Sequence, residues 1–500
     1  MKFTTIVFGC QMNYSDTARI KSVLQNCHWE YVDTVDDADV VIFDTCSVRQ
    51  KSEDKVTGKL MEIPPEKKVW ITGCMIQHNL RNTVVHKKTK GKSVKGLMGV
   101  GNFVGTVQTI DPDIIGLSNM EIEEFRPKPG AEDNVIYINN AFNPMFHNIH
   151  KSWKNVELFF RIDDTGFLPL MMKRIGYEVT YDGELTNEYT SILPEGATTL
   201  HTSQKKTAFV PISTGCNQFC AYCIVPYARG MEKNMKSDQI LSEVQHHIDS
   251  GIQEITLLGQ IVNKYPDFDK LCDDIFALPG DLKRLRYTSP YPTFYSDQLL
   301  SLHEKQERMC PHIHMPLQSG STAVLKKMFR GYDREQYIEF VDKIRNLKRD
   351  ISLTTDIIVG FTDETEEDFQ QTLSLVEYAR FDMIYIGIYS VRPGTYAARK
   401  YVDNIPKEIK HDRWNRLNEL LKKISAENNA KEIGNIRTVM LTKKEILSSS
   451  KVQYTGYTDN QKQIKIMYNG DQSSAPWLGS FVQAKITDSK QFLLVGDVLV

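Results

Sequence analysis

The chain of 500 residues lacks the long apolar runs that membrane-spanning segments require. No stretch of about 18 consecutive apolar residues occurs, so we expect no transmembrane helix. The first residues, Met1–Cys10, contain too short an apolar stretch for a secretory signal and no small-residue cleavage site. These absences predict a cytoplasmic protein.

The chain also lacks an excess of charge of either sign, since 61 Lys and Arg oppose 63 Asp and Glu for a net charge of −2. This balance excludes a strongly basic nucleic-acid coat, although it is compatible with a local basic patch. No internal repeat and no low-complexity tract occurs. With 41% hydrophobic and 25% charged residues, the composition is that of a globular protein, and the length predicts three or four domains.

The first ninety residues alternate between short apolar runs and stretches with helical periodicity. The apolar runs predict buried strands at Thr4–Phe8, Val40–Phe43 and Val69–Thr72. Helices are predicted between them, at Ser15–Leu24 and Ser52–Leu60. Strands that alternate with helices favour an α/β domain with a doubly wound parallel sheet.

Residues 88–205 follow no pattern that assigns a fold, and we interpret them as a possible insertion carried by the first domain. Order returns with six predicted strands, most of them separated by amphipathic helical stretches, at Phe209–Ser213, Glu254–Leu258, Leu285–Thr288, Ile313–Leu317, Leu353–Val359 and Met383–Tyr389. Six strand–helix units fit a partial (β/α)6 barrel better than the eight units of a full one. A long charged helix is predicted next, at Lys407–Ala430.

The last 65 or so residues change class, because short strands follow one another without helices. They are predicted at Thr438–Thr442, Val452–Tyr457, Gln463–Tyr468, Phe481–Thr487 and Phe492–Val495. Five such strands predict a small β-barrel of the oligonucleotide-binding kind. We therefore divide the chain into residues 1–200, 202–432 and 433–500.

The C-terminal part is the basic end of a neutral protein, with eight Lys and Arg against five Asp and Glu from Gly434 onward. Positive charge and aromatic rings together suit RNA, through phosphate contacts and base stacking. A solvated barrel exterior would look similar. The residues predicted to contact RNA are Lys443, Lys444, Lys462 and Lys465, with Tyr454, Tyr457 and Tyr468 as stacking surfaces.

Nine cysteines occur, and in a reducing cytosol their clustering points to a metal or to catalysis rather than to disulfides. Three of them form a central trio, Cys216-x3-Cys220-x2-Cys223, directly after a predicted strand. Three thiolates do not complete the four-ligand site of structural zinc. A [4Fe–4S] cluster held by three cysteines leaves one iron open to a small molecule. The spacing favours such a cluster over three buried or zinc-bound thiols.

Three other cysteines form an N-terminal trio: Cys10, Cys46 and Cys74 each come just past the end of a predicted strand. In an open parallel sheet the carboxyl ends of the strands meet at one edge, where ligands bind. One buried cysteine is ordinary packing. Three at three strand ends predict a second thiolate site, although they lie 36 and 28 residues apart.

Both trios and their surroundings resemble the methylthiotransferase family of radical S-adenosylmethionine (SAM) enzymes, over residues 1–80 and 205–500. The family-like motifs are Gly9-Cys10-Gln11-Met12-Asn13, Asp44-Thr45-Cys46-Ser47-Val48-Arg49, Thr72-Gly73-Cys74-Met75-Ile76-Gln77, Gly215–Pro226, Leu258-Gly259-Gln260, Met315–Ser321, Asp356–Phe361 and Arg392–Thr395. The resemblance implies two [4Fe–4S] clusters: an auxiliary one on the N-terminal trio, which delivers the sulfur, and one on the central trio, which makes a radical from SAM. It also implies that the terminal barrel is a nucleic-acid-binding TRAM domain.

The residues beside the N-terminal trio are similar to those of the MiaB branch of this family. Members of that branch add a methylthio group to C2 of N6-isopentenyladenosine next to the tRNA anticodon, at position 37. The resemblance thus implies a transferase of tRNA modification, and no side chain is assigned as a catalytic acid or base.

Four residues at predicted strand ends, where ligands of a barrel bind, are expected to contact SAM: Gly259, Gln260, Gln318 and Gly360. The glycines could instead only permit tight turns. Arg229 is predicted to contact RNA, with a solvated arginine as the alternative. His312 and His314 are interpreted as pointing to opposite faces of one strand, which would exclude a ligand pair.

The implied partners are tRNA, an external electron donor of the flavodoxin or ferredoxin kind and a source of sulfur, and we expect a monomer. Two substrates of the same chemistry stay open, namely threonylcarbamoyl-adenosine of tRNA and a ribosomal-protein aspartate. A non-catalytic RNA-binding protein with zinc sites is the alternative from another class, and metal analysis would separate it from the enzyme.

Overall fold

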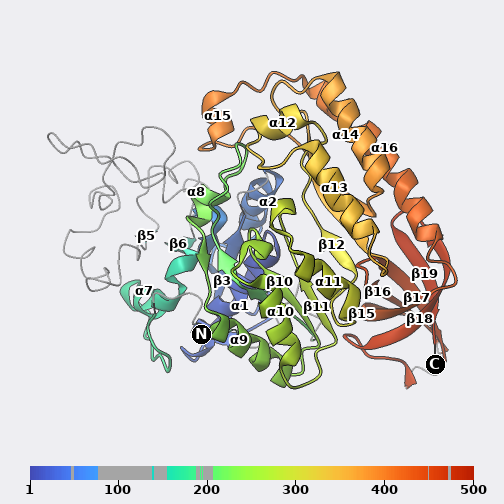
Figure 1. Ribbon diagram of the computed structural model, residues 1–500. Helices are drawn as coiled ribbons and strands as arrows, with labels where there is room; N and C mark the ends of the chain where they lie inside the picture. Colours follow the sequence, from blue (N-terminus) through green and yellow to red (C-terminus); the bar gives the residue numbers. More distant parts are fainter. Residues whose placement is uncertain are drawn as a thin grey trace. The chain divides into compact units, whose positions relative to one another are not determined.

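The computed structural model (Figure 1) divides into two compact units, which we describe separately. The first consists of Met1–Glu195 with the short segment Ile224–Gly230, and the second of Gly196–Cys223 with Met231–Val500. The structure describes residues 1–46, 50–76, 138–139, 155–186, 192, 194, 206–448, 450–470 and 474–499. None of the helices in these ranges is long and apolar enough to cross a membrane.

The first unit is built on a six-stranded sheet with the order β2-β1-β3-β4-β6-β5, in which β5 alone runs antiparallel to its neighbour. Its strands are β1 (Lys2–Val7), β2 (Glu30–Tyr31), β3 (Val40–Thr45), β4 (Lys68–Gly73), β5 (Ile138–Asn139) and β6 (Val156–Phe159). Every residue of β3 is buried, which explains why this strand reads as a continuous apolar run instead of an alternating one. The three strands predicted for this region are confirmed.

The helices of the first unit are α1 (Gln11–Gln25), α2 (Gln50–Met61), a 3-10 turn (Ile162–Phe167), α7 (Leu168–Arg174) and α8 (Val225–Arg229). Of these, α1 and α2 connect parallel strands, which need a crossover. The chain passes from β1 through α1 to β2 on one side of β1, and then to β3 on its other side. Such a reversal of strand order opens a crevice at the carboxyl ends of the strands.

Part of the segment that we interpreted as an insertion belongs to this sheet. Strand β6 pairs with β4, and Phe159 and Phe160 lie in the same hydrophobic core as Trp70. The sequence pattern missed β6 because a four-residue strand is too short for a clear period. Residues 88–137, 140–154, 187–191, 193 and 195–205 of that segment lie outside the described residues.

The second unit contains six parallel strands arranged in two three-stranded sheets, β11-β10-β7 and β12-β13-β14, as expected of a partial barrel. The strands are β7 (Thr207–Pro211), β10 (Glu254–Leu258), β11 (Arg284–Tyr287), β12 (His312–His314), β13 (Ser352–Val359) and β14 (Met383–Ile388). Between the two sheets, the segment before β12 continues the pairing: Leu285 N–H donates to the Arg308 carbonyl at 2.8 Å, and Cys310 N–H to the Leu285 carbonyl at 3.1 Å.

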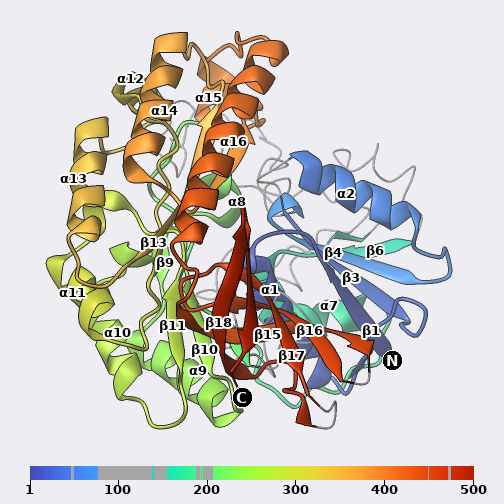
Figure 2. The same cartoon turned by 90° about the vertical axis from the view of Figure 1, so that its right-hand side faces the viewer.

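Helices and a short hairpin complete this part of the unit. The helices are α9 (Ser237–Asp249), α10 (Phe268–Ala277), α11 (Asp297–Lys305), α12 (Thr322–Lys327), α13 (Arg334–Arg345), α14 (Glu366–Ala379), α15 (Tyr396–Lys400) and α16 (Lys407–Ala430), and the hairpin pairs β8 (Ser213–Thr214) with β9 (Lys233–Asn234). Helices α13, α14 and α16 lie side by side (Figures 1 and 2). The long helix has the predicted bounds.

The chain ends in a closed five-stranded barrel with the order β15-β16-β17-β19-β18, as predicted (Figure 2). Its strands are β15 (Ile436–Ser448), β16 (Lys451–Thr458), β17 (Gln463–Asn469), β18 (Phe481–Lys490) and β19 (Leu493–Val498). The domain boundary predicted at residue 433 falls inside the second unit and stays a prediction.

Two buried arginines attach this C-terminal barrel to the amino ends of β10 and β11. Arg284 donates to the Thr438 carbonyl at 2.5 Å and Arg286 to the Thr458 carbonyl at 3.1 Å, while Glu254 pairs with both guanidinium groups at 3.2 and 3.3 Å. Charge-assisted hydrogen bonds away from water are stronger than neutral ones. The C-terminal barrel therefore covers the amino ends of these strands and leaves their carboxyl ends for a site.

Gly73, the last residue of β4, provides a test of the packing beside the N-terminal trio. Its φ is +97°, and an added Cβ would lie 2.2 Å from the Thr45 carbonyl oxygen on β3. We expect Gly73→Ala to speed amide hydrogen exchange in β3 and β4. The added methyl group would collide with the backbone of Thr45, which cannot move aside as a flexible side chain can. Gly58 in α2 has no atom near such a Cβ. As the control, Gly58→Ala should stabilise its helix by about 0.5–1 kcal/mol; equal exchange in both variants would contradict the prediction.

Candidate functional site: two cysteine trios

The structure brings the N-terminal trio together at the carboxyl edge of β1, β3 and β4. Cys10 precedes α1 as its N-cap, while Cys46 and Cys74 follow the last residues of β3 and β4 and are buried. An added Cβ on Gly9 would lie 3.1 Å from Cys46 Cβ, which shows how closely the first two strand ends approach. Burial raises the pKa of the Cys74 thiol, and the charges of Cys46 and Cys10 raise it further.

A buried asparagine links these strand ends. Asn13 accepts a hydrogen bond from Cys10 N–H at 3.2 Å and donates to Asp44 Oδ1 at 2.8 Å and to the Thr45 carbonyl at 3.2 Å. The Thr45 hydroxyl in turn donates to the Thr72 carbonyl on β4. Because each polar group has a partner, the positions just before the three cysteines are held in one register. This explains physically the Asn of the Gly9–Asn13 motif.

Arg229 lies in the first unit, and its contacts overturn the prediction that it binds RNA. Its Nη2 donates to Asp16 Oδ2 at 2.6 Å, and its Nε donates to Cys74 Sγ at 3.2 Å. The side chain is only 5% exposed, so RNA phosphate has no access to it. The buried carboxylate of Asp16, which the sequence did not single out, explains the buried position, since a buried charge requires a partner.

The central trio follows the short strand β8, after a turn at Gly215 with a φ of +70°. Cys216 and Cys220 are buried and Cys223 is half-buried, and Cys223 N–H donates to the Cys220 carbonyl at 2.9 Å. Burial raises the pKa of the Cys216 thiol to about 11. Thiols bind metal as thiolates, so metal binding at Cys216 releases a proton.

Arg330 has the same relation to the central trio as Arg229 has to the N-terminal one. Its Nη1 donates to Cys220 Sγ at 3.3 Å, and its Nε donates to the Tyr332 hydroxyl at 3.0 Å. No sequence signal singles out Arg330, because it lies 110 positions from Cys220 and such a contact leaves no local pattern.

The donor chemistry of both trios fits iron–sulfur clusters. Each trio offers three thiols, and each has a guanidinium that donates to one sulfur, which favours negative charge on that sulfur. Among the described residues, no three His, Cys, Asp or Glu are grouped as ligands of one metal ion. In a [4Fe–4S] cluster the cysteines bind different irons, so its ligands do not converge on one point.

The four residues predicted to contact SAM follow the strands β10, β12 and β13. An added Cβ on Gly259 would lie 2.6 Å from Ser213 Oγ, so this glycine packs against the strand that leads into the central trio. Gln318 pairs with β13 through its backbone. At Gly360 the N–H donates to Glu364 Oε1 at 2.9 Å and Lys410 fills the space of a Cβ, so this glycine serves the turn. Gln260 is half-buried.

The interpretation of His312 and His314 was wrong, because residues two apart on a strand share a face. His312 Nε2 and His314 Nδ1 both lie 2.9 Å from the hydroxyl of Thr354. His314 Nε2 lies 3.0 Å from Asp356 Oδ2. Polar side chains of β12 and β13 thus form one hydrogen-bonded chain, which ends at the half-buried Asp356.

The lysines predicted to contact RNA differ in their positions on the C-terminal barrel. Lys443 and Lys465 are exposed and both pair with Thr455, from the two sides of β16, so they lie in one row across the barrel. Lys444 is half-buried, with its Nζ 5.9 Å from the centre of the Tyr454 ring. The row across Thr455 is therefore one exposed basic surface of the C-terminal barrel.

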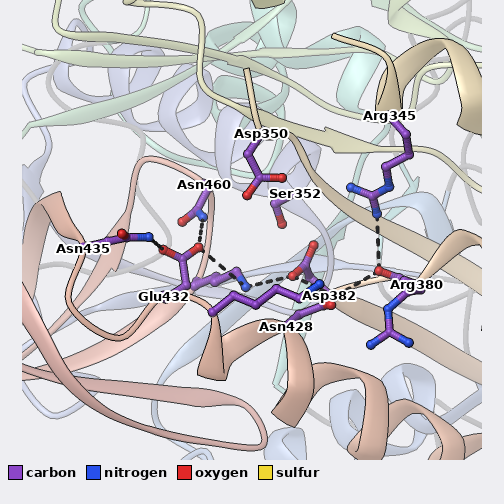
Figure 3. Close-up of a pocket in the computed structure, with 11 residues that line it drawn as sticks. Arg345, Asp350, Ser352, Arg380, Asp382, Asn428, Glu432, Asn435 and Asn460 are labelled. Carbon is purple, nitrogen blue, oxygen red and sulfur yellow. Dashed lines mark hydrogen bonds and ion pairs between the residues drawn. The ribbon is translucent and has the colours of Figure 1, made fainter. Parts of the chain in front are cut away.

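Lys462 was predicted to contact RNA, and the structure corrects this. Its side chain is 9% exposed and pairs with Asp382 at 2.8 Å and Glu432 at 3.8 Å. These residues line a polar cavity of about 280 Å³, and in Figure 3 Asn435 and Asn460 lie around the Glu432 carboxylate. Lys462 therefore joins the C-terminal barrel to β14 and α16.

Two of the three tyrosines predicted to stack on RNA are also corrected. Tyr454 and Tyr468 are buried in the hydrophobic core of the C-terminal barrel, where they pack with Ile464 and Ile466. Their positions alternate inward along the strands, as apolar residues do in a closed barrel. Tyr457 is half-buried.

The ion pairs of Lys462 generate a prediction about stability. Lys462→Met should destabilise the C-terminal barrel by about 1–3 kcal/mol, because Asp382 loses the cation that lies 2.8 Å from it, whereas Glu432 keeps Arg437 at 2.8 Å. Amide hydrogen exchange of β15–β19 measures the effect. The exposed Lys465 supplies the control, since Lys465→Met should change stability by no more than about 0.5 kcal/mol. Equal protection in both variants would show that Lys462 is not part of the core.

Comparisons with known proteins agree with the two-part organisation of the site. A profile described as Radical SAM superfamily matches residues 210–376, and one described as Uncharacterized protein family UPF0004 matches residues 2–96. These ranges contain the central trio and the N-terminal trio, respectively.

Similar curated proteins carry the name tRNA-2-methylthio-N(6)-dimethylallyladenosine synthase. That of Thermoanaerobacter sp. (strain X514) is 33% identical over 98% of this chain and 91% of its own length. That of Clostridium perfringens (strain SM101 / Type A) is 32% identical over 99% and 97%, and that of Bacillus cytotoxicus 33% over 100% and 86%. The resemblance inferred from the motifs is confirmed, and the chain belongs to this family of radical SAM enzymes.

Proposed function

We propose that this protein is a tRNA methylthiotransferase that adds a methylthio group to C2 of N6-isopentenyladenosine at position 37, next to the anticodon. The observation that carries the proposal is the pair of separate cysteine trios, each at the carboxyl end of a strand and each with an arginine donor on one sulfur. The names of the relatives support the substrate.

Two [4Fe–4S] clusters and SAM are the proposed cofactors. Cys10, Cys46 and Cys74 would hold the auxiliary cluster, and Cys216, Cys220 and Cys223 the cluster that binds SAM. When bound, these groups supply a carbon radical and the sulfur to be transferred, neither of which a side chain provides.

The protein's own contribution is to position the cofactors. Asn13 keeps the strand ends beside Cys10 and Cys46 in register. Gln260 and Gln318 stand at strand ends suited to SAM. Gly259 and Gly360 would act there through tight backbone turns, because the N–H of Gly360 already donates to Glu364.

We assign the binding of tRNA to the C-terminal barrel. The proposed domains are residues 1–200, 202–432 and 433–500, and the barrel is the last of them. Lys443 and Lys465 are free to approach phosphates on its exposed surface. Lys444, the next residue of β15, lies outside this row, beside Tyr454, and its contact with RNA stays a prediction. A basic row of this kind binds the backbone without reading its sequence.

An external one-electron donor of the flavodoxin or ferredoxin kind and a source of replacement sulfur complete the proposed set of partners. The protein would act as a monomer in the cytoplasm, where its tRNA substrate is available. Threonylcarbamoyl-adenosine of tRNA and a ribosomal-protein aspartate are the other substrates that the same chemistry could modify.

The reaction can be tested by mass spectrometry of nucleosides. Isopentenylated tRNA is incubated without oxygen with the reconstituted protein, SAM and dithionite, and we expect a methylthio mass gain on isopentenyladenosine. The same sample should contain about eight irons per chain. Cys46→Ala and Cys220→Ala should each abolish the gain, because each removes a cluster ligand.

Cys272 provides the matched control, since it lies on α10 and is buried in the hydrophobic core of the second unit. Cys272→Ala should retain the iron and the activity. Full iron content without a mass gain would exclude isopentenyladenosine and direct attention to the two other substrates. Zinc in place of iron would exclude the enzyme altogether.

The basic row can be tested through the salt dependence of tRNA binding. Lys443→Ala and Lys465→Ala should each weaken binding and reduce the slope of log K against log salt by about 1, because each would remove one phosphate contact. Lys305→Ala, an exposed lysine of α11, is the control and should leave the slope unchanged. If all three variants had the same slope as the wild-type protein, tRNA would bind outside this basic row.

A further inference from the structure

Each cysteine trio has one arginine that donates a hydrogen bond to one of its sulfurs. In the first unit Arg229 Nε lies 3.2 Å from Cys74 Sγ. In the second unit Arg330 Nη1 lies 3.3 Å from Cys220 Sγ. The two contacts arise independently, on α8 and directly after α12, so each belongs to its own trio.

The guanidinium of Arg229 is fixed by an acidic partner. Its Nη2 pairs with Asp16 Oδ2 at 2.6 Å, and the side chains of Arg229 and Asp16 are 5% and 0% exposed. An arginine side chain keeps its positive charge in proteins, and Asp16 holds the guanidinium of Arg229 in place. The carboxylate therefore offsets part of the positive charge that Cys74 experiences.

The guanidinium of Arg330 is fixed by aromatic partners instead. The Nε of Arg330 donates to the Tyr332 hydroxyl. The guanidinium carbon Cζ lies 4.5 Å from the centre of the Tyr291 ring and 5.0 Å from the centre of the Tyr332 ring. Aromatic faces hold a cation in place without cancelling its charge. Cys220 therefore experiences more of the positive charge of its arginine than Cys74 does.

Both arrangements have a consequence for a cluster bound to the trio. One-electron reduction adds a negative charge to the cluster and its sulfurs. Hydrogen bonds to the sulfurs are among the factors that set the reduction potential of iron–sulfur clusters. A donor that also carries a positive charge stabilises the reduced form and raises the potential.

We propose that Arg229 and Arg330 are dedicated positioning residues, one for each cluster, which raise the reduction potential of the cluster on their own trio by donating to Cys74 and Cys220. This inference rests on the proposed assignment of two clusters. It goes beyond the proposed function by giving each site its own electrostatic control. The effect of Arg330 should be the larger one, because no carboxylate offsets it among its described contacts.

The test is a potentiometric titration of the reconstituted full-length protein with dithionite as the electron source, followed by electron paramagnetic resonance. Full-length variants with one trio replaced by alanines assign the two signals. The test variants are Arg330→Gln and the double variant Arg229→Gln with Asp16→Asn, which removes the ion-pair partner of Arg229 together with its charge. Each is compared with its charge-preserving partner, Arg330→Lys or Arg229→Lys.

We expect each glutamine variant to shift the midpoint potential of its own cluster to more negative values and to leave the other potential unchanged. The lysine variants should retain most of the original potential, which a purely structural role would not predict. Loss of about four of the eight irons, confined to the trio of the substituted arginine, would show that the arginine only retains the cluster and would overturn the proposal.

Equal potentials in wild-type and glutamine variants would overturn the proposal, as would a joint shift of both signals or a loss of iron from both trios. These outcomes can be distinguished from failure of the proposed function, because the iron content and the methylthiolation activity of the wild-type protein test that function separately. A wild-type chain that binds no iron would refute the clusters themselves. A wild-type chain with about eight irons and no methylthiolation would refute only the reaction.

Discussion

The common direction of parallel strands is the constraint on which the rest of the structure depends. Because β1, β3 and β4 run parallel and adjacent, their carboxyl ends meet at one edge, and cysteines separated by 36 and 28 residues become neighbours. The buried Asn13 network then holds those ends in register. In the second unit the central trio lies instead within one segment after β8, and Gly259, which follows β10, packs against Ser213 of β8.

Buried charge is used for two different purposes in this protein. Around Glu254 and Lys462, ion pairs attach the C-terminal barrel to the amino ends of the strands and to α16. Around the trios, Arg229 and Arg330 donate to sulfur. In both cases a group that would be costly to bury alone is stabilised by its partner, so each position tolerates few substitutions. The carboxyl ends of the strands stay available for cofactors.

The wrong predictions of RNA contacts share one physical cause. Arg229, Lys462, Tyr454 and Tyr468 have side chains that suit RNA, but whether such a side chain is exposed depends on partners distant in the chain. Arg229 meets Asp16, 213 residues away, and Lys462 meets Asp382. The tyrosines lie on the inward face of a strand whose register only the closed barrel determines. The two histidines were misread for a simpler reason, since a period of two keeps them on one face.

The sequence by itself determined the alternation of strands and helices, the closed C-terminal barrel, the two cysteine trios and the family, because periodicity and cysteine spacing are local properties of the chain. Only the tertiary structure decided which charged side chains are buried, which lysines form a basic row, and that one arginine approaches each trio. These depend on contacts between residues far apart in sequence, such as Arg229 with Cys74 and Arg330 with Cys220, and such contacts leave no local pattern.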